Sequence, residues 1–204
     1  NGDKYAEIQR VRLGTRLPAY LPQRINEKLV KVLADFKRKA SEIGIQQFVV
    51  QTHFESAMEV TPEARQAVGQ LIAAGWLVTN QQVFTAAASR RGHTARLRQV
   101  LNQIGVLPYY TFSVKGFREN YHNFATNARS VQEQIEEKHF GAISHQYYRD
   151  IARLNEQPER MVEQLKELQE RAGVAFLGTD RSVLNLPGVG KSCTFRTIGM
   201  TREG

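Results

Sequence analysis

The 204-residue chain contains a single cysteine, Cys193, and a single tryptophan. One cysteine excludes an intramolecular disulfide and any metal site built only from cysteines of this chain. No apolar run approaches the length that spans a bilayer, no signal-peptide pattern opens the sequence, and no short-period repeat or low-complexity linker occurs. These absences favour a protein of a reducing, cytoplasmic compartment that does not enter a membrane.

Positive charge is in excess, with a formal net charge of +8. Such a balance permits binding to phosphates, nucleic acid or acidic partners. The lysines and arginines are scattered, however, and several fall on amphipathic helical segments, where they are typical of a solvated surface. Nucleic acid is therefore not an expected partner, and a homo-oligomer is left open.

Both ends of the sequence suggest a piece of a longer chain. Asn1 is not an initiator methionine, and the last residues, 201–204, follow a strand-like segment. We expect residues 1–204 to belong to one domain and to be a fragment, or a processed or partly recorded chain. The length is sufficient for a substantial hydrophobic core.

Strand-like and helix-like segments alternate along the chain. Apolar runs and alternation predict strands at residues 8–14, 47–52, 76–79 and 106–114, with shorter strands at 175–177 and after Lys191. Helical patterns follow these strands: residues 26–43 with Asn26 as N-cap and Gly44 at the end, 61–74 with Thr61 as N-cap, and 94–105 with Thr94 as N-cap. Residues 130–139 and 144–172 form a more charged helical segment near the C-terminus. The order predicts an α/β fold with parallel strands, either a partial (β/α) barrel or a doubly wound sheet.

Polar residues follow most of the predicted strands. Because the carboxyl ends of parallel strands meet at one edge of a sheet, we expect these residues to form a site there. They are Thr15 and Arg16, the run 53–55, the pair Asn80 and Gln81, Lys115, and Lys191.

The segment around Lys191 has the sequence NLPGVGKS at residues 185–192. It is similar to a phosphate-binding P-loop, but that motif needs a glycine where Asn185 stands and a helix after the lysine. The β-branched residues after Lys191 favour a strand instead. The alternatives are a solvated lysine on a Gly/Pro turn and a lysine that forms a Schiff base.

Several of these segments together resemble the C-terminal half of the lysine 2,3-aminomutase family of radical S-adenosylmethionine enzymes. The resemblance covers nearly the whole chain and rests on segments that occur in the family's order. They are RLGTR (12–16), LPQRI (21–25), THF (52–54), EVTPEA (59–64), NQ (80–81), PYY (108–110) and PGVGK (187–191).

The resemblance implies a partial (β/α) barrel of the radical S-adenosylmethionine type, with a [4Fe-4S] cluster, S-adenosylmethionine and pyridoxal phosphate as cofactors. It implies an isomerase that moves an amino group between adjacent carbons of an amino acid, in which the cofactors carry the radical chemistry. The family's CxxxCxxC cluster motif lies upstream of all these segments and is absent here. We therefore expect this chain to lack the cluster ligands and to be inactive alone, and it provides no metal ligand of its own.

By position, Lys191 resembles the family's Schiff-base lysine, and Gly188 and Gly190 make room for the cofactor phosphate. His53, Asn80 and Gln81 resemble residues on the S-adenosylmethionine side of the barrel mouth. Arg16 resembles an arginine at the same rim, where it would hold a carboxylate or phosphate.

The substrate position differs from that of lysine aminomutases. Lys115 stands where those enzymes have an aspartate that grips the distal ammonium of lysine, so we expect a substrate other than lysine, such as an acidic or phosphate-bearing amino acid. The turn before Lys191 is also one glycine shorter, with Val189 in place of a glycine. The alternative function is a non-catalytic α/β module that binds a phosphate or nucleotide.

Overall fold

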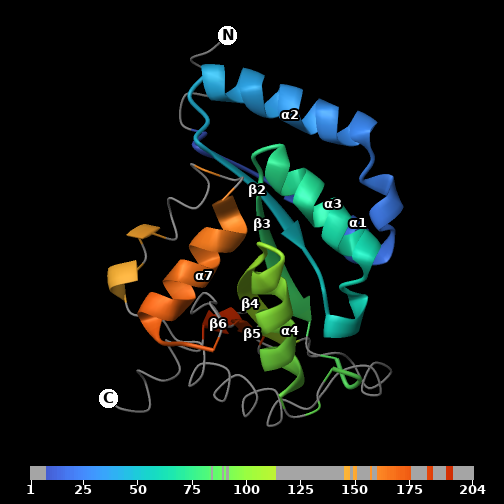
Figure 1. Cartoon of the computed structure of the whole chain (residues 1–204), viewed down its shortest axis with the longest axis vertical. Coiled ribbons are helices and arrows are strands. Elements are labelled where there is room, and N and C mark those ends of the chain that lie inside the picture. Colours follow the sequence, from blue (N-terminus) through green and yellow to red (C-terminus); the bar gives the residue numbers. More distant parts are fainter. Residues whose placement is uncertain are drawn as a thin grey trace.

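The computed structural model describes residues 8–83, 85–88, 90, 92–113, 145–147, 149–150, 157, 160–175, 183–185 and 192–194. Strands and helices alternate along these ranges (Figure 1). The strands are β1 (Arg10–Gly14), β2 (Gln47–Thr52), β3 (Leu77–Val83), β4 (Leu107–Ser113), β5 (Val183–Asn185) and β6 (Ser192–Thr194). The α-helices are α1 (Leu17–Tyr20), α2 (Glu27–Glu42), α3 (Pro62–Ala73), α4 (His93–Gln103) and α7 (Met161–Ala172), and the short 3₁₀ helices are η2 (Pro22–Arg24), η3 (Ala57–Glu59) and η5 (His145–Tyr147).

The strands form one sheet in which their spatial order follows their order in the chain. The first four strands pair in parallel, β5 continues in parallel with β4, and β6 pairs antiparallel with β5. The predicted α/β class with parallel strands is confirmed. A doubly wound sheet reverses its strand order at a switch point, and the described sheet has no such reversal. The closure of the sheet into a partial barrel stays a prediction.

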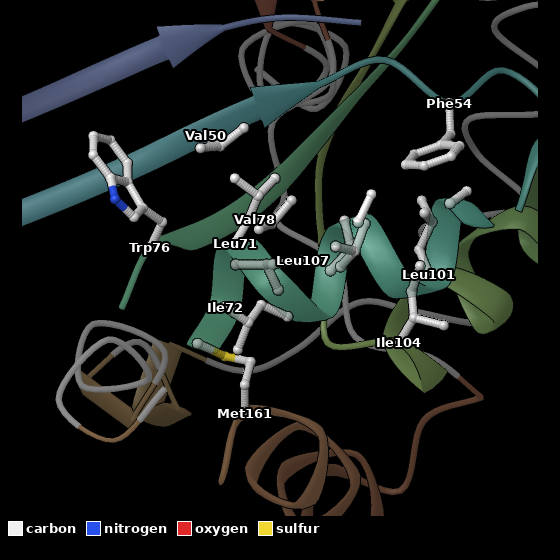
Figure 2. Close-up of a cluster of buried hydrophobic side chains, with 14 of the residues drawn as sticks. Val50, Phe54, Leu71, Ile72, Trp76, Val78, Leu101, Ile104, Leu107 and Met161 are labelled. Atoms are coloured by element: carbon white, nitrogen blue, oxygen red, sulfur yellow. The ribbon is translucent and has the colours of Figure 1, made fainter. Parts of the chain in front are cut away.

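The helices cover the sheet through one continuous hydrophobic core. Figure 2 shows Val50, Val78 and Leu107 of the strands among Leu71 and Ile72 of α3, with residues of α4 and α7 alongside. In a sheet whose strands follow chain order, right-handed crossovers bring successive helices to the same face. Residues that alternate with the core residues along β2, such as Gln47 and Gln51, therefore point to the opposite face.

The predicted helix starts have a clear local cause. The Asn26 side chain accepts a hydrogen bond from the Leu29 N–H at 3.1 Å, and the Thr61 side chain accepts one from the Ala64 N–H at 3.2 Å. Each bond satisfies an amide that has no partner within the helix. Gly44 follows α2 with φ of 96°, which confirms it as the residue where that helix ends.

Two predicted boundaries were wrong. Helix α4 begins at His93 with Gly92 as N-cap at φ 77°, because the glycine enters the left-handed region and lets the chain turn into the helix before Thr94. Strand β3 does not end at Thr79 but continues to Val83, because β4 pairs with it as far as Val83 and Phe112. Asn80 and Gln81 consequently lie within the strand, where the register with β4 shifts between them.

Helix α2 was predicted correctly, but its apolar stripe is only partly covered. Phe36 packs its ring on Trp76 and against Phe48, yet 42% of Phe36 and 56% of Val32 remain exposed. The helix connects β1 to β2, and β1 is the edge strand of the described sheet. A helix at the margin of a sheet has a neighbouring helix on one side only, which explains the partial burial.

Near the C-terminus, the described parts can be compared with the predicted helix and strands. Helix α7 lies inside the predicted helical range 144–172, and β6 confirms a strand after Lys191. Strand β5 was not predicted, and its Asn185 pairs with Ser192 of β6. A strand was predicted at 175–177, but Ala175 lies in no strand. Residues 176–177 and the predicted helix at 130–139 lie outside the described residues. No helix in the described ranges combines the length and apolar character needed to cross a membrane.

Candidate functional site

Four of the predicted site residues lie along one edge of the sheet. Arg16 follows β1 and His53 follows β2, while Asn80 and Gln81 lie within β3, level with the end of β2. The register pairs Gly14 with Gln51 and Thr52 with Asn80, so the ends of these three parallel strands are neighbours. The structure thus brings Arg16 and His53 to the C-terminal edge, as predicted, and places Asn80 and Gln81 within β3 beside the end of β2. That these residues form one site stays a prediction.

The loop after β2 is tied to the residues after β1 by a carboxylate. Glu59 accepts a hydrogen bond from the Arg16 guanidinium at 3.1 Å through one oxygen. Its other oxygen accepts the Glu55 N–H at 2.6 Å and the Ser56 N–H at 3.4 Å, as part of a capping box at the start of η3. The Arg16 guanidinium also lies 5.8 Å from the centre of the Tyr20 ring. Glu59 thus fixes both the arginine and the backbone beside His53.

Asn80 uses its side chain to hold the end of β2. Its amide oxygen accepts the Phe54 N–H at 2.6 Å, and its amide nitrogen donates to the Phe54 carbonyl at 3.0 Å. Both residues are buried. The structure therefore places Asn80 beside the predicted cofactor site as a support of the backbone between His53 and Glu55. Its direct contact with a cofactor stays a prediction.

Gln81 points to the face of the sheet opposite the helices. Gln51 lies on the same face of β2, and its amide nitrogen donates to the Gln81 side-chain oxygen at 2.5 Å. Gln81 is half-buried, and among the described residues its amide nitrogen has no hydrogen-bond partner. It can donate a hydrogen bond to a ligand on that face.

His53 is half-buried, and no described residue forms a hydrogen bond with its ring. Burial lowers the pKa of His53, and the positive charge of Arg16 lowers it further. The imidazole is consequently neutral at pH 7. A neutral ring offers one nitrogen as a donor and the other as an acceptor.

Glu55 is a buried acid at the same edge. It belongs to the polar run 53–55 but was not among the predicted site residues. One carboxyl oxygen accepts the Val83 N–H at 2.7 Å. Burial raises the pKa of Glu55 to about 7, and Glu59 adds to this, while the bond from Val83 and the charge of Arg16 oppose it. The sequence feature that could have identified Glu55 is its position two residues after His53, because both residues then lie on the loop that follows β2.

The remaining predicted site residues, Lys115, Gly188, Gly190 and Lys191, lie outside the described residues. The strands that flank the last three of them are described. Because β5 runs parallel to β4, its last residue, Asn185, lies at the same sheet edge as the ends of β1 to β4, and Ser192 of β6 pairs with it there. Among the described residues, no group of three or more histidine, cysteine, aspartate or glutamate side chains could hold a metal ion.

Comparison with known proteins gives several relatives, although no family model matches the chain. An uncharacterized KamA family protein of Methanocaldococcus jannaschii is 37% identical over 127 residues, which are 62% of this chain and 19% of that protein. The L-lysine 2,3-aminomutase of Methanococcus maripaludis is 34% identical over 106 residues, or 52% of this chain and 22% of the enzyme. The glutamate 2,3-aminomutase of Clostridioides difficile is 32% identical over 116 residues, or 56% of this chain and 25% of the enzyme.

The matches cover about half of this chain or somewhat more, and the chain spans only about a fifth to a quarter of the length of these relatives. Their names include the aminomutases to which the sequence segments show a resemblance. The chain is therefore related to KamA family proteins, and it is similar to several L-lysine 2,3-aminomutases.

Proposed function

We propose that this chain is part of a radical S-adenosylmethionine enzyme that moves an amino group between adjacent carbons of an amino acid. The relationship to aminomutases supports an isomerase of this kind. The observation that carries the proposal for this chain is the convergence of Arg16, His53 and Gln81 on one sheet edge. Each has a donor or acceptor group that forms no hydrogen bond with a described residue.

The proposed fold is a partial (β/α) barrel whose mouth is this edge. Sequential parallel strands with helices on one face are the arrangement from which such barrels are built. In a barrel, the opposite face of the sheet lines the interior, and here it carries Gln51 and Gln81. A face that carries two glutamine amides, of which Gln51 is buried and Gln81 half-buried, suits a polar ligand better than an apolar one.

The residues present differ in how they fit the implied cofactors. A [4Fe-4S] cluster does not fit this chain, since three thiolate ligands are needed and the sequence has one cysteine. Its ligands would have to come from outside residues 1–204. The residues predicted to bind pyridoxal phosphate, Lys191, Gly188 and Gly190, lie outside the described residues. The binding of pyridoxal phosphate therefore stays a prediction.

S-adenosylmethionine fits the described edge as a polar ligand with hydroxyl, amino and carboxylate groups. When bound and reductively cleaved, it supplies a radical that removes a hydrogen atom from the substrate. Gln81 would donate a hydrogen bond from its free amide nitrogen, and the neutral His53 ring would accept one and donate one. The free guanidinium nitrogens of Arg16 would bind a carboxylate while Glu59 holds the group in place.

The substrate is proposed to be an amino acid other than lysine, with Lys115 contacting an anionic group on it. Among the relatives, both a lysine and a glutamate aminomutase occur. A cationic side chain at position 115 would repel the distal ammonium of lysine and attract the side-chain carboxylate of glutamate. A cytoplasmic location belongs to the same proposal, because a single cysteine suits a reducing compartment.

The proposal is tested on the full-length protein from the complete reading frame, purified and reconstituted with iron and sulfide without oxygen. We expect a CxxxCxxC motif upstream, formation of 5′-deoxyadenosine from S-adenosylmethionine after reduction, and a β-amino acid product from one member of an amino-acid panel. His53→Ala and Gln81→Ala should lower S-adenosylmethionine cleavage at least tenfold, whereas Gln66→Ala on the exposed face of α3 should not.

A complete reading frame without the motif, or a loaded enzyme that leaves S-adenosylmethionine intact, would overturn the proposal. Borohydride reduction with pyridoxal phosphate tests Lys191 separately. Labelling should occur in the wild type and disappear in Lys191→Ala, and labelling that persists in that variant contradicts the Schiff-base role.

A further inference from the structure

Helix α4 begins with backbone hydrogen-bond donors that are not used. The first N–H groups of any helix have no acceptor inside that helix. The side chains of Asn26 and Thr61 accept such a bond at the starts of α2 and α3, whereas Gly92 has no side chain and α4 has no capping bond. No described residue accepts a hydrogen bond from the N–H of Thr94 or of Ala95. The start of α4 is therefore open to an acceptor from outside the helix.

Thr94 adds a buried polar atom without a partner at the same place. The residue is 0% exposed, and its hydroxyl oxygen, Oγ1, has no hydrogen-bond partner in the described part of the chain. Side chains of a helix lean toward its N-terminus, so from the second position of α4 this hydroxyl points toward the end where the unused amides lie. The ring of the preceding His93 also has a buried nitrogen, Nε2, without a partner. An unpaired buried hydroxyl is costly, and a ligand that accepts its hydrogen bond would remove this cost.

The charges at this helix start favour an anion. The helix dipole places partial positive charge at the N-terminus, and α4 has no acidic residue in its first turn to offset it. Arg90 and Arg96 are exposed on either side of the start, and neither forms an ion pair with a described residue. On η3, which lies beside α4, the carboxylate of Glu59 is bound to Arg16. The surplus charge is therefore positive.

The start of α4 also lies where α/β proteins bind ligands. The helix follows β3, so its first turn lies at the C-terminal edge of the sheet (Figure 1). Helix N-termini at this edge hold phosphate groups through their backbone N–H groups. The site proposed above uses Arg16, His53 and Gln81, none of which belongs to α4. The helix start is thus a separate set of donors at the same edge.

We propose that the start of α4 is an anion-binding site that holds the phosphate group of a small molecule. The N–H groups of Thr94 and Ala95 and the hydroxyl of Thr94 donate hydrogen bonds to the phosphate oxygens. The Nε2 atom of His93 is available as a further donor, and Arg90 and Arg96 add positive charge. The phosphate is either inorganic or part of a nucleotide or a phosphorylated amino acid. The site does not depend on the proposed radical reaction.

Calorimetric titration of the full-length protein at constant ionic strength tests the site. The probes are inorganic phosphate, AMP and O-phospho-L-serine. We expect all three to bind, because they share the phosphate group. Tighter binding of AMP than of inorganic phosphate identifies a nucleotide as the source, and tighter binding of phosphoserine identifies a phosphorylated amino acid. Binding of both no tighter than inorganic phosphate identifies a site for the free anion.

Replacing Thr94 separates the hydroxyl from the shape of the side chain. Thr94→Val keeps the shape, and the loss of one hydrogen bond to a charged group should weaken phosphate binding about tenfold. Thr94→Ser should restore the affinity. Without phosphate, Thr94→Val should be at least as stable as the wild type in urea unfolding, since valine leaves no unpaired hydroxyl. The matched control is Thr61→Val, which removes the capping bond of α3 and should lower stability without changing phosphate affinity.

A second pair of variants does not depend on Thr94. Gly92 is exposed, and a Cβ at this position meets no atom within 4 Å. Its φ of 77° lies in the left-handed region, which asparagine and aspartate tolerate better than most residues. Gly92→Asp places a negative charge beside the site and should weaken phosphate binding about tenfold relative to Gly92→Asn, which has nearly the same shape without the charge.

Three results would overturn the proposal. They are no binding of inorganic phosphate at millimolar concentration, unchanged phosphate affinity in both Thr94→Val and Gly92→Asp, and a loss of affinity in Thr61→Val equal to that in Thr94→Val. Failure of the proposed function would alter none of these results, because the titrations require neither the cluster nor cleavage of S-adenosylmethionine.

Discussion

Asn80, within β3, and Phe54, just after the end of the adjacent parallel strand β2, exchange two hydrogen bonds of opposite direction. The amide side chain takes the place of a strand partner for the backbone of Phe54, whose own side chain is fully buried in the core. Since Phe54 lies between His53 and Glu55, this one contact sets the position of both site residues. An amide that looked like a ligand contact in the sequence therefore also stabilises the site.

Replacing Asn80 by Leu should destabilise the fold. The variant has a similar volume, but it leaves the buried N–H and C=O of Phe54 without partners, at about 1–3 kcal/mol for each group. Urea unfolding followed by tryptophan fluorescence measures the change. Gln66→Ala, on an exposed position of α3, is the control and should change the free energy of unfolding by less than about 0.5 kcal/mol. A loss in Asn80→Leu no larger than in this control would contradict the structural role.

Glu55 should make the stability of the protein fall with rising pH. Its pKa is about 7 in the folded state and near its ordinary value of 4.5 when unfolded. Between these values the folded state holds a proton that the unfolded state has lost, so the free energy of unfolding decreases as pH rises through this interval and levels off above it. The contribution is on the order of 3 kcal/mol at most.

The variant Glu55→Gln cannot ionise and isolates this effect. We expect it to match the wild type at pH 5 and to be more stable than the wild type at pH 8, as measured by urea unfolding at both pH values. Equal stability of the two proteins at pH 8 would show that the carboxyl of Glu55 ionises without cost in the folded state. Glu63→Gln, at a solvent-exposed acid, should not show the same pH-dependent gain.

Arg16 should control the protonation of His53. Burial is the larger cause of the lowered pKa of His53 and the charge of Arg16 is the smaller, so Arg16→Gln should raise that pKa while leaving it below its ordinary value. An NMR titration of the imidazole measures the midpoint. Arg38→Gln, which removes an exposed arginine paired with Glu42 on α2, serves as the control. A midpoint that moves equally in both variants would show that only the net charge matters.

The sequence predicted the elements whose signals are local. Asn26 and Thr61 are N-caps, each with a side-chain bond to an amide in the first helical turn, and such signals are visible in a few neighbouring residues. Strand β2 was also predicted with its observed bounds, because its apolar residues continue on both faces, as parallel strands require. The position of Arg16 and His53 at one edge of the sheet was predicted from the order of these elements.

The parts that the sequence did not predict depend on partners distant in the chain. Strand β3 extends past Thr79 because β4 pairs with it, and β5 forms a strand because β4 and β6 flank it. Glu55 became a site residue only when the structure showed its bond to Val83, 28 positions away. A polar residue after a strand can point to solvent or back over the sheet, and periodicity does not distinguish these orientations.

Gly105 and Gly44 offer a matched test of packing around the helices. Both follow a helix with positive φ, 81° and 96°, so an alanine at either position is strained by about 1–2 kcal/mol. A Cβ at Gly44 would meet no atom within 4 Å, whereas at Gly105 it would lie 2.8 Å from Ile72 Cδ1 and 3.4 Å from Met161 Cγ. Those side chains belong to α3 and α7, which pack together at this point. We therefore expect Gly105→Ala to cost about 1–3 kcal/mol more than Gly44→Ala, from overpacking of the core. Urea unfolding of the two variants measures the difference, and equal losses would mean that α7 moves away from α3 without cost.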